Sequence, residues 1–216
     1  MSLDRRTLLR FVLVAVLALA GALALDRAAY ALLYDPGVYD HDWGRALRSL
    51  GFLPTWIAAA AALALQDGPA RGRARGRVYA RALFLFLAPT LAGIAGAVLQ
   101  LVIRRERPWA HAGDYVFRPF TDRPFYGGGL AMPSSHAVVA FGAACALARL
   151  FPRAAPVWYL LAAGCALTRV LARSHFLSDV VLAAIVGWLV ASLLWRWLRP
   201  AGQAILASGG DASDEG

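Results

Sequence analysis

Long apolar runs without charged residues alternate along this chain with short polar segments. Apolar residues lie on all sides of each run rather than in one stripe, which is typical of helices buried in lipid or in a helical bundle. The pattern therefore predicts an all-α, polytopic membrane bundle with six transmembrane helices. The six runs are residues 11–25, 49–66, 82–103, 137–148, 154–168 and 180–195.

The lengths of these runs add a constraint. Runs 49–66 and 82–103 reach the ~17–25 residues that cross a bilayer, whereas the other four are shorter. Charged residues that flank the shorter runs must then extend to the membrane interface or face a polar cavity.

The first run has two interpretations. Three arginines precede it, and Ala22-Leu23-Ala24 at its end resembles a cleavage site, so the segment could be a removable signal peptide. We favour an uncleaved first span, because the segment is continuous with a bundle-like sequence.

Composition supports a membrane protein. The chain has 216 residues, of which 60% are hydrophobic and 16% are charged, whereas soluble domains average about 25% charged residues. This balance argues against a soluble enzyme and predicts one membrane-integrated domain over residues 1–200. Residues 201–216 are expected to form a short disordered tail, since its end is small, polar and acidic.

The positive charge of the chain is carried by arginine alone. All 22 basic residues are Arg, against 13 acidic residues, for a net charge of +9. Five of the arginines crowd into residues 71–81, which we interpret as a cytoplasmic topology signal and not as a nucleic-acid site. This orientation places both termini in the cytoplasm. The absence of Lys and the abundance of Ala suggest a GC-rich bacterial genome, and hence the bacterial inner membrane.

Three polar clusters interrupt the apolar chain. They cover residues 100–108, 133–136 and 168–179, at the ends of different predicted spans. Under the topology above, all three lie at the outer face of the membrane. We therefore expect an active site at that face.

The third cluster contains a histidine and a carboxylate. His175 and Asp179 are four residues apart, so they share a face if this segment is helical. A carboxylate bonded to one ring nitrogen would leave the other nitrogen free to attack an electrophile. Asp179 is the only acid between residues 123 and 210. An isolated carboxylate in an apolar helix needs a partner, and the candidates are His175 and the nearby arginines.

The second cluster supplies another histidine. His136 follows Pro133-Ser134-Ser135, a turn whose backbone N–H groups could face an anion at a helix start. Two histidines with Arg107 and Arg169 would provide a nucleophile, a proton donor and fixed positive charge for phosphoryl transfer. One acid beside two histidines and several arginines disfavours a metal site, and no cofactor is expected.

These residues resemble the membrane branch of the type-2 phosphatidic acid phosphatase superfamily. Its signature is Lys-x6-Arg-Pro, then Pro-Ser-Gly-His, then Ser-Arg-x5-His-x3-Asp, and the three motifs occur here in that order. The resemblance implies a six-span phosphatase without metal, in which His175 forms a phosphohistidine. It further implies that Asp179 orients His175 and that His136 is the general acid. The phosphate would be held by Arg107, Arg169, Ser134 and Ser135.

Three positions depart from the family pattern. Gln100 replaces the motif Lys, Ser135 replaces Gly, and Thr168 replaces Ser. Thr168 keeps the hydroxyl, and Ser135 requires that the turn avoid positive φ or accept strain. Gln100 is the larger change, since an amide donates a hydrogen bond but carries no charge. Arg104 or Arg105 is a candidate to compensate as a phosphate ligand, and Arg104 lies one helical turn from Gln100 on the same face.

The expected function is metal-independent removal of phosphate from a lipid phosphate or diphosphate. An isoprenyl diphosphate or phosphatidate of the cell envelope is the expected substrate. Two alternatives stay open: a phosphotransferase that passes the phosphate to another lipid or sugar, and a non-catalytic lipid-binding protein on the same scaffold. No nucleic-acid partner is expected, and no feature of the sequence indicates an oligomeric state.

Overall fold

The computed structural model describes residues 5–67 and 79–206. Within this part the regular structure is entirely helical, without strands, and the prediction of an all-α bundle is confirmed. The helices are α1 (Arg5–Leu32), α2 (Asp42–Ser49), α3 (Leu53–Gln66), α5 (Ala80–Ile103), α6 (Ser135–Leu150), α7 (Ala155–Leu171) and α8 (Leu177–Leu206), with short 3₁₀ turns η1 (Pro108–His111) and η2 (Pro152–Ala154).

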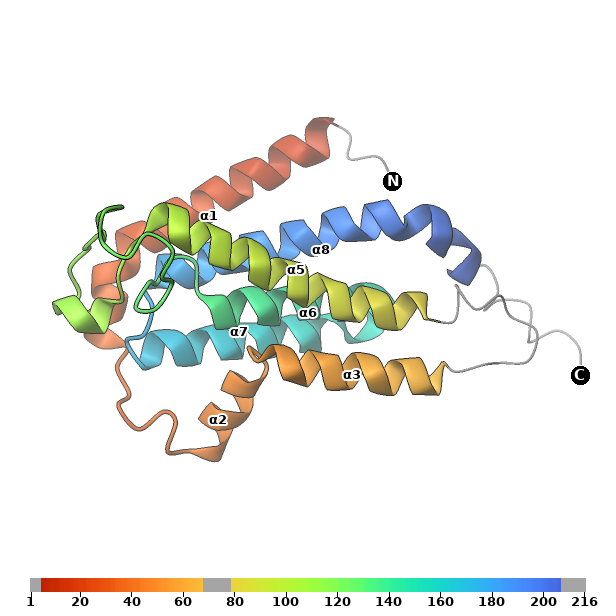
Figure 1. Cartoon of the computed structure of the whole chain (residues 1–216), viewed down its shortest axis with the longest axis horizontal. Coiled ribbons are helices and arrows are strands. Elements are labelled where there is room, and N and C mark those ends of the chain that lie inside the picture. Colours follow the sequence, from red (N-terminus) through yellow and green to blue (C-terminus); the bar gives the residue numbers. More distant parts are fainter. Residues whose placement is uncertain (1–4, 68–78, 207–216) are drawn as a thin grey trace, which may run out of the picture.

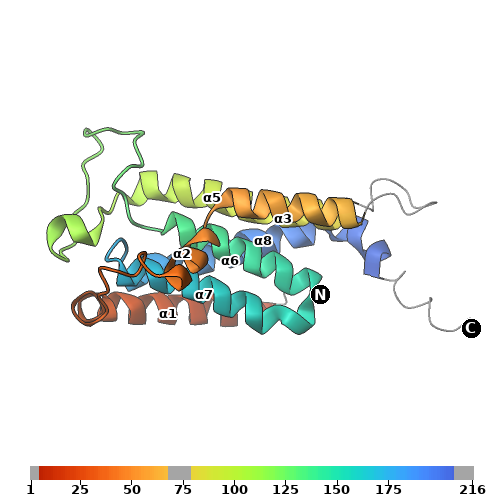
Figure 2. The same ribbon diagram turned by 90° about the horizontal axis from the view of Figure 1, so that it is seen from below.

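Helix α6 is the centre of the bundle. It packs against α5, α7 and α8, and nearly every residue from Ala137 to Leu147 is buried. Figure 2 shows α5 and α3 on one side of α6, with α7 and α1 on the other. Because other helices surround α6, it has no wide face that meets solvent. This burial explains why its run lacks a polar stripe.

Small residues set the distance between α6 and α8. A Cβ atom at Gly187 would lie 2.8 Å from the backbone N of Gly142 and 2.9 Å from the carbonyl O of Val138. The two backbones can therefore approach only because Gly187 has no side chain, as is common where membrane helices pack closely.

The apolar helices differ in their ability to span a membrane. In the part of the chain that the structure describes, four segments are long and apolar enough, namely Leu9–Leu32, Ala80–Ile103, Pro152–Leu171 and Leu177–Leu198. The pair α2 and α3 would count as a fifth span if taken together, but it is bent by 67°. Helix α6 has 16 residues and is shorter. The structure thus supports a multi-span membrane protein, and six crossings remain a prediction.

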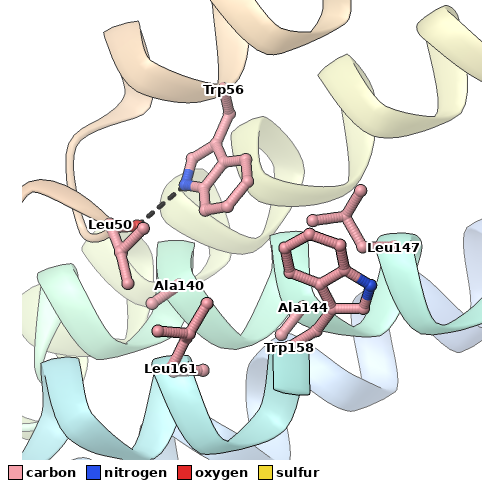
Figure 3. Close-up of a pocket in the computed structure, with 8 residues that line it drawn as sticks. Leu50, Trp56, Ala140, Ala144, Leu147, Trp158 and Leu161 are labelled. Atoms are coloured by element: carbon pink, nitrogen blue, oxygen red, sulfur yellow. Dashed lines mark hydrogen bonds between the residues drawn. The ribbon is translucent and has the colours of Figure 1, made fainter. Parts of the chain in front are cut away.

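The bend between α2 and α3 breaks the run predicted at 49–66. Helix α2 ends at Ser49, and α3 begins at Leu53. The indole Nε1 of Trp56 donates to the carbonyl O of Leu50 at 2.8 Å. This bond closes the corner between α2 and α3. Next to the corner lies an apolar pocket between α3, α6 and α7, and Figure 3 shows Trp56 and Trp158 among the side chains that line it.

Helix α1 packs along α8 and continues through the possible cleavage site at residues 22–24. Before that point, the ring of Phe11 stacks on Trp188 with centroids 4.3 Å apart. Beyond it, Asp26 is fully buried. The segment is thus one continuous helix with contacts on both sides of residues 22–24, and its retention as a first span stays a prediction.

Two predicted segments fall partly or wholly outside the described residues. Most of the arginine-rich segment 71–81 lies in the undescribed residues 68–78. The expected tail begins at residue 201, where α8 still continues to Leu206, and residues 207–216 lie outside the described part.

The contact between α6 and α8 gives a stability prediction. Gly187→Ala places a methyl group against backbone atoms of α6, and overpacking of this kind costs about 1–3 kcal/mol. We expect a lower Tm in detergent, measured by thermal unfolding. Gly21→Ala is the matched control, because a Cβ at Gly21 on α1 meets nothing within 4 Å. Equal Tm changes for the two variants would contradict this account of the contact.

Candidate active site

The three polar clusters of the sequence lie together at one end of the bundle. The loop after α5, the start of α6 and the turn between α7 and α8 gather at the left of Figure 1. The side-chain amide of Gln100 donates to the carbonyl O of Pro133 at 2.8 Å. The backbone N of Ser134 donates to the carbonyl O of Asp179 at 3.1 Å. These bonds join the first cluster to the second and the second to the third.

His175 is held in one tautomer by a backbone group. Its Nδ1 lies 2.9 Å from the carbonyl O of Ala131. Since a carbonyl only accepts, Nδ1 must carry the proton and Nε2 must present its lone pair. Nε2 is buried without a hydrogen-bond partner among the described residues. His175 is thus oriented as a nucleophile would need to be.

Asp179 lies beside this ring without making the expected close bond. Its Oδ2 is 3.7 Å from His175 Nδ1 and accepts from the backbone N of Phe176 at 2.7 Å. Its Oδ1 accepts from the guanidinium of Arg105. Asp179 therefore caps the start of α8 and is the negative charge next to His175, while Ala131 makes the orienting hydrogen bond.

Burial determines the protonation of His175, which lies in the turn between α7 and α8. Burial lowers the pKa of His175 below its usual value, although Asp179 acts in the opposite direction. The neutral ring, with a free lone pair, is favoured in the resting site.

Arg105 belongs to a buried network that sequence reasoning missed. Its guanidinium lies 3.8 Å from Asp26 on α1 and donates to the hydroxyl of Ser178 at 2.7 Å. Asp26 accepts from the backbone N of Ser178 at 2.7 Å and from the hydroxyl of Tyr115 at 2.8 Å. Burial, together with the hydrogen bond to Asp26, raises the pKa of Tyr115 to about 12. Asp26 could have been noticed as a lone acid at the end of an apolar run.

Arg104, expected at the phosphate, holds the following loop together. It ends α5 in a left-handed conformation, with φ of 59°. Its guanidinium donates to four backbone carbonyls at 2.5–3.0 Å, those of Arg118, Pro119, Asp122 and Pro124. All three of its nitrogens are thus occupied by the loop.

The same loop neutralises its own acid. Arg118 Nε donates to Glu106 at 2.8 Å, and His111 lies 2.5 Å from the other oxygen of that carboxylate. The hydrogen bond from Arg118 lowers the pKa of Glu106 below its usual value. Glu106 is therefore a paired carboxylate and not a free base.

His136 and the two serines begin α6. Ser135 is the first residue of the helix, so it has helical backbone and avoids the positive φ that would have strained it. His136 Nε2 and the Ser134 hydroxyl are buried without hydrogen-bond partners among the described residues. A Cβ at Gly51 would lie 2.8 Å from the Cα of His136, so a glycine is required for the α2–α3 corner to approach this histidine.

Arg107 and Arg169 reach the same region from two sides. Arg107 precedes η1, and Arg169 lies near the end of α7, where its Nη1 donates to the hydroxyl of Tyr39 at 2.6 Å. In residues 5–67 and 79–206 neither guanidinium forms an ion pair with a carboxylate. Thr168 donates to Cys165 O within α7 at 2.8 Å, so its hydroxyl serves the helix.

The predicted residues share one unusual property. Among the described residues, eight buried side-chain N or O atoms have no hydrogen-bond partner, and five of them belong to the predicted site. Buried polar atoms normally find partners, so these atoms are candidates to bind a ligand. The five are Arg107 Nε, Ser134 Oγ, His136 Nε2, Arg169 Nε and His175 Nε2.

The donor set of this site suits an anion. No group of three or more His, Cys, Asp or Glu residues that could hold a metal ion occurs in the described part of the chain. Guanidinium groups and N–H donors instead converge, and these bind phosphate oxygens.

Comparison with known proteins agrees with this geometry. The profile of the PAP2 superfamily matches residues 81–203, which include all three motifs. The chain is 30% identical to a lipid A 1-phosphatase of Rhizobium etli, over 73% of this chain and 74% of that protein. No solved structure gives a significant match. The family match and this relative together show that the chain belongs to the PAP2 superfamily and is a lipid phosphatase, a hydrolase of phosphate esters.

Proposed function

We propose that this protein removes phosphate from a membrane lipid without a metal ion, through a phosphohistidine at His175. The observation that carries the proposal is the group of five unpartnered buried atoms from three separate motifs. Every carboxylate near them is already engaged, since Arg105 pairs with Asp179 and Asp26, and Arg118 pairs with Glu106. Within the described part of the chain, the remaining positive charge of Arg107 and Arg169 has no carboxylate counter-ion, so it suits a phosphate dianion.

The first step transfers the phosphoryl group to the enzyme. The lone pair on His175 Nε2 attacks phosphorus, and the bond between phosphorus and the lipid oxygen breaks. His136 gives its proton to that leaving oxygen, since a bound dianion would offset the nearby guanidinium charges and let His136 hold a proton. Arg107, Arg169 and the first backbone N–H groups of α6 stabilise the three equatorial oxygens.

The second step regenerates the enzyme. Water attacks phosphorus, His136 takes a proton from it, and the bond between phosphorus and His175 Nε2 breaks. Inorganic phosphate leaves, and His175 returns to its neutral form with Nδ1–H still donating to Ala131. Asp179, 3.7 Å from Nδ1, stabilises the ring while it carries positive charge.

The position of the site suits a lipid substrate. It lies at one end of the apolar helices, so the chains of a lipid can stay in the bilayer while the headgroup binds at Arg107 and Arg169. The name of the Rhizobium relative supports a lipid A phosphate as one substrate. Isoprenyl diphosphates and phosphatidate are the other members of the panel to assay. We propose six crossings of the bacterial inner membrane, cytoplasmic termini and a site at the outer face.

The proposed nucleophile gives the first functional prediction. His175→Gln keeps a donor for Ala131 O but removes the attacking nitrogen, so phosphate release should fall on the order of a thousandfold or more. Release from the lipid panel is measured on purified protein in detergent, with Tm as a check on folding. His41→Gln is the control, because His41 is exposed at the start of α2. Substantial turnover by a folded His175→Gln protein would exclude His175 as the nucleophile.

Metal independence is tested separately. The proposal assigns charge stabilisation to guanidinium groups, so phosphate release should continue unchanged in excess EDTA. The assay compares initial rates with and without EDTA, and after added Mg²⁺. Loss of activity in EDTA that a divalent ion restores would contradict the proposal.

The protonation state of His175 makes a further prediction. Its pKa is lowered in the folded protein, so below the ordinary value of about 6.5 the unfolded chain binds a proton that the folded chain does not. Folding stability is therefore lost as the pH falls through 6.5, by at most ~1.4 kcal/mol per pH unit. We measure the Tm of the wild type and of His175→Gln at pH 7.5, 6.5 and 5.5. As the pH falls, the Tm of the wild type should decrease more steeply than that of His175→Gln. Parallel pH profiles would show that His175 is not held neutral.

A further inference from the structure

One arginine outside the three motifs faces the site. Arg48 lies near the end of α2, which packs against α7. Its side chain is half-buried, and its Nε is buried without a hydrogen-bond partner among the described residues. It forms no ion pair with a carboxylate in that part of the chain. Like Arg107 and Arg169, Arg48 thus has a buried Nε without a hydrogen-bond partner and no ion pair among the described residues.

Tyr39 connects Arg48 to the site. The guanidinium of Arg48 lies over the Tyr39 ring, 4.7 Å from its centroid, and that of Arg169 lies 5.7 Å from the same centroid. The Tyr39 hydroxyl accepts from Arg169 Nη1 at 2.6 Å and donates to the carbonyl O of Thr168 at 3.1 Å. Two like charges thus flank one aromatic ring, which favours an anion between or beside them.

The backbone of Arg48 is tied to the residue that contacts His136. The backbone N of Gly51 donates to the carbonyl O of Arg48 at 3.0 Å, and a Cβ at Gly51 would lie 2.8 Å from the Cα of His136. Arg48 is therefore one helical turn from the contact between this corner and His136.

The position of α2 depends on two close contacts. A Cβ at Gly44 would lie 1.7 Å from the carbonyl O of Val38, so only glycine allows α2 to meet the preceding loop. On the next helix turns, Leu47 packs against Gly164 of α7, and Gly51 packs against His136. These contacts lie on either side of Arg48 and hold its backbone against the site.

The first motif lacks the charge that its family pattern has. Gln100 is buried, and its amide nitrogen donates to Pro133 O at 2.8 Å, so it supports the turn before α6. Arg104 cannot replace that charge, because its guanidinium is occupied by loop carbonyls. Arg107 and Arg169 would supply two cations to a phosphate in this site. A third cation would have to come from a residue outside the first motif.

We propose that Arg48 is a third phosphate-binding guanidinium, which supplies from α2 the positive charge that Gln100 does not carry. Tyr39 is a positioning residue that orients Arg48 and Arg169 together. The inference rests on the proposed function for the identity of the lipid substrate, but it concerns phosphate binding itself. Arg45, one turn earlier, shows the contrast: its side chain is 57% exposed and pairs with Asp42 at 2.5 Å.

Binding of inorganic phosphate to the purified full chain tests this proposal. We measure its Kd by calorimetry in detergent, and kcat/KM on the lipid panel. Arg48→Gln should weaken phosphate binding by about tenfold to a hundredfold, as expected for one lost charge-assisted bond. Arg48→Lys should retain part of the affinity. Arg27→Gln is the charge-matched control, since Arg27 is 78% exposed and pairs with Asp114.

A rescue experiment separates ligand binding from a structural role. Gln100→Lys, added to Arg48→Gln, should restore much of the phosphate affinity by returning the cation to the first motif. Failure of this rescue would overturn the claim that Arg48 replaces the missing lysine. If Arg48→Gln lowers the Tm enough to explain its weaker phosphate binding, and Arg48→Lys has the same low Tm, then Arg48 has a structural role and the proposal is wrong.

The two proposals fail in different ways. If Arg48→Gln binds phosphate and turns over lipid phosphate as the wild type does, this inference alone is wrong. If the wild type binds phosphate through Arg48 but releases none from any lipid, the proposed function is wrong and the phosphate site stands.

Discussion

The buried guanidinium of Arg105, between the carboxylates of Asp179 and Asp26, is the interaction on which the site depends. It joins α1, the loop after α5 and the start of α8, and all three side chains are almost fully removed from solvent. Removing one partner of such a network leaves an uncompensated buried charge and costs ~3–5 kcal/mol. Asp179 also accepts a hydrogen bond from the backbone N of Phe176, the residue after His175. The network therefore fixes the backbone next to His175. The His175 ring is therefore positioned by groups whose own hydrogen bonds are made within the protein.

This network also explains why the remaining charge is available for a ligand. Each acid near the site is paired with an arginine that has a structural role, Arg105 or Arg118, and Arg104 is occupied by carbonyls. Among the described residues, the guanidinium groups of Arg107 and Arg169 form no ion pair, because the structural arginines pair with the local carboxylates. A chain whose positive charge is all arginine thus separates into arginines that hold the fold and arginines whose charge is free of a carboxylate partner in the described residues.

Sequence reasoning recovered what depends on local pattern and missed what depends on tertiary contact. Apolar runs predicted the long helices, because each of these segments is apolar on all sides, but they did not predict α2 or its bend to α3. Motif spacing selected His136, His175 and Arg169 as candidates. Asp26 was missed because its partner Ser178 is 152 residues away. The orienting role of Ala131 was missed because a backbone carbonyl has no sequence signal. The break between α2 and α3 at Gly51 was missed. It follows from the close approach of Gly51 to His136, and that contact exists only in the folded bundle.

Gln100 connects these two levels. From the sequence it is a lost charge, whereas in the fold its amide makes the hydrogen bond to Pro133 O that sets the turn before α6. A side chain at this position therefore has two separable tasks: to donate to that carbonyl and to bring a cation. An amide performs the first and not the second, so the cation can come from another element close to the candidate site. Helix α2 is such an element, because its corner contacts His136 through Gly51 and α7 through Leu47.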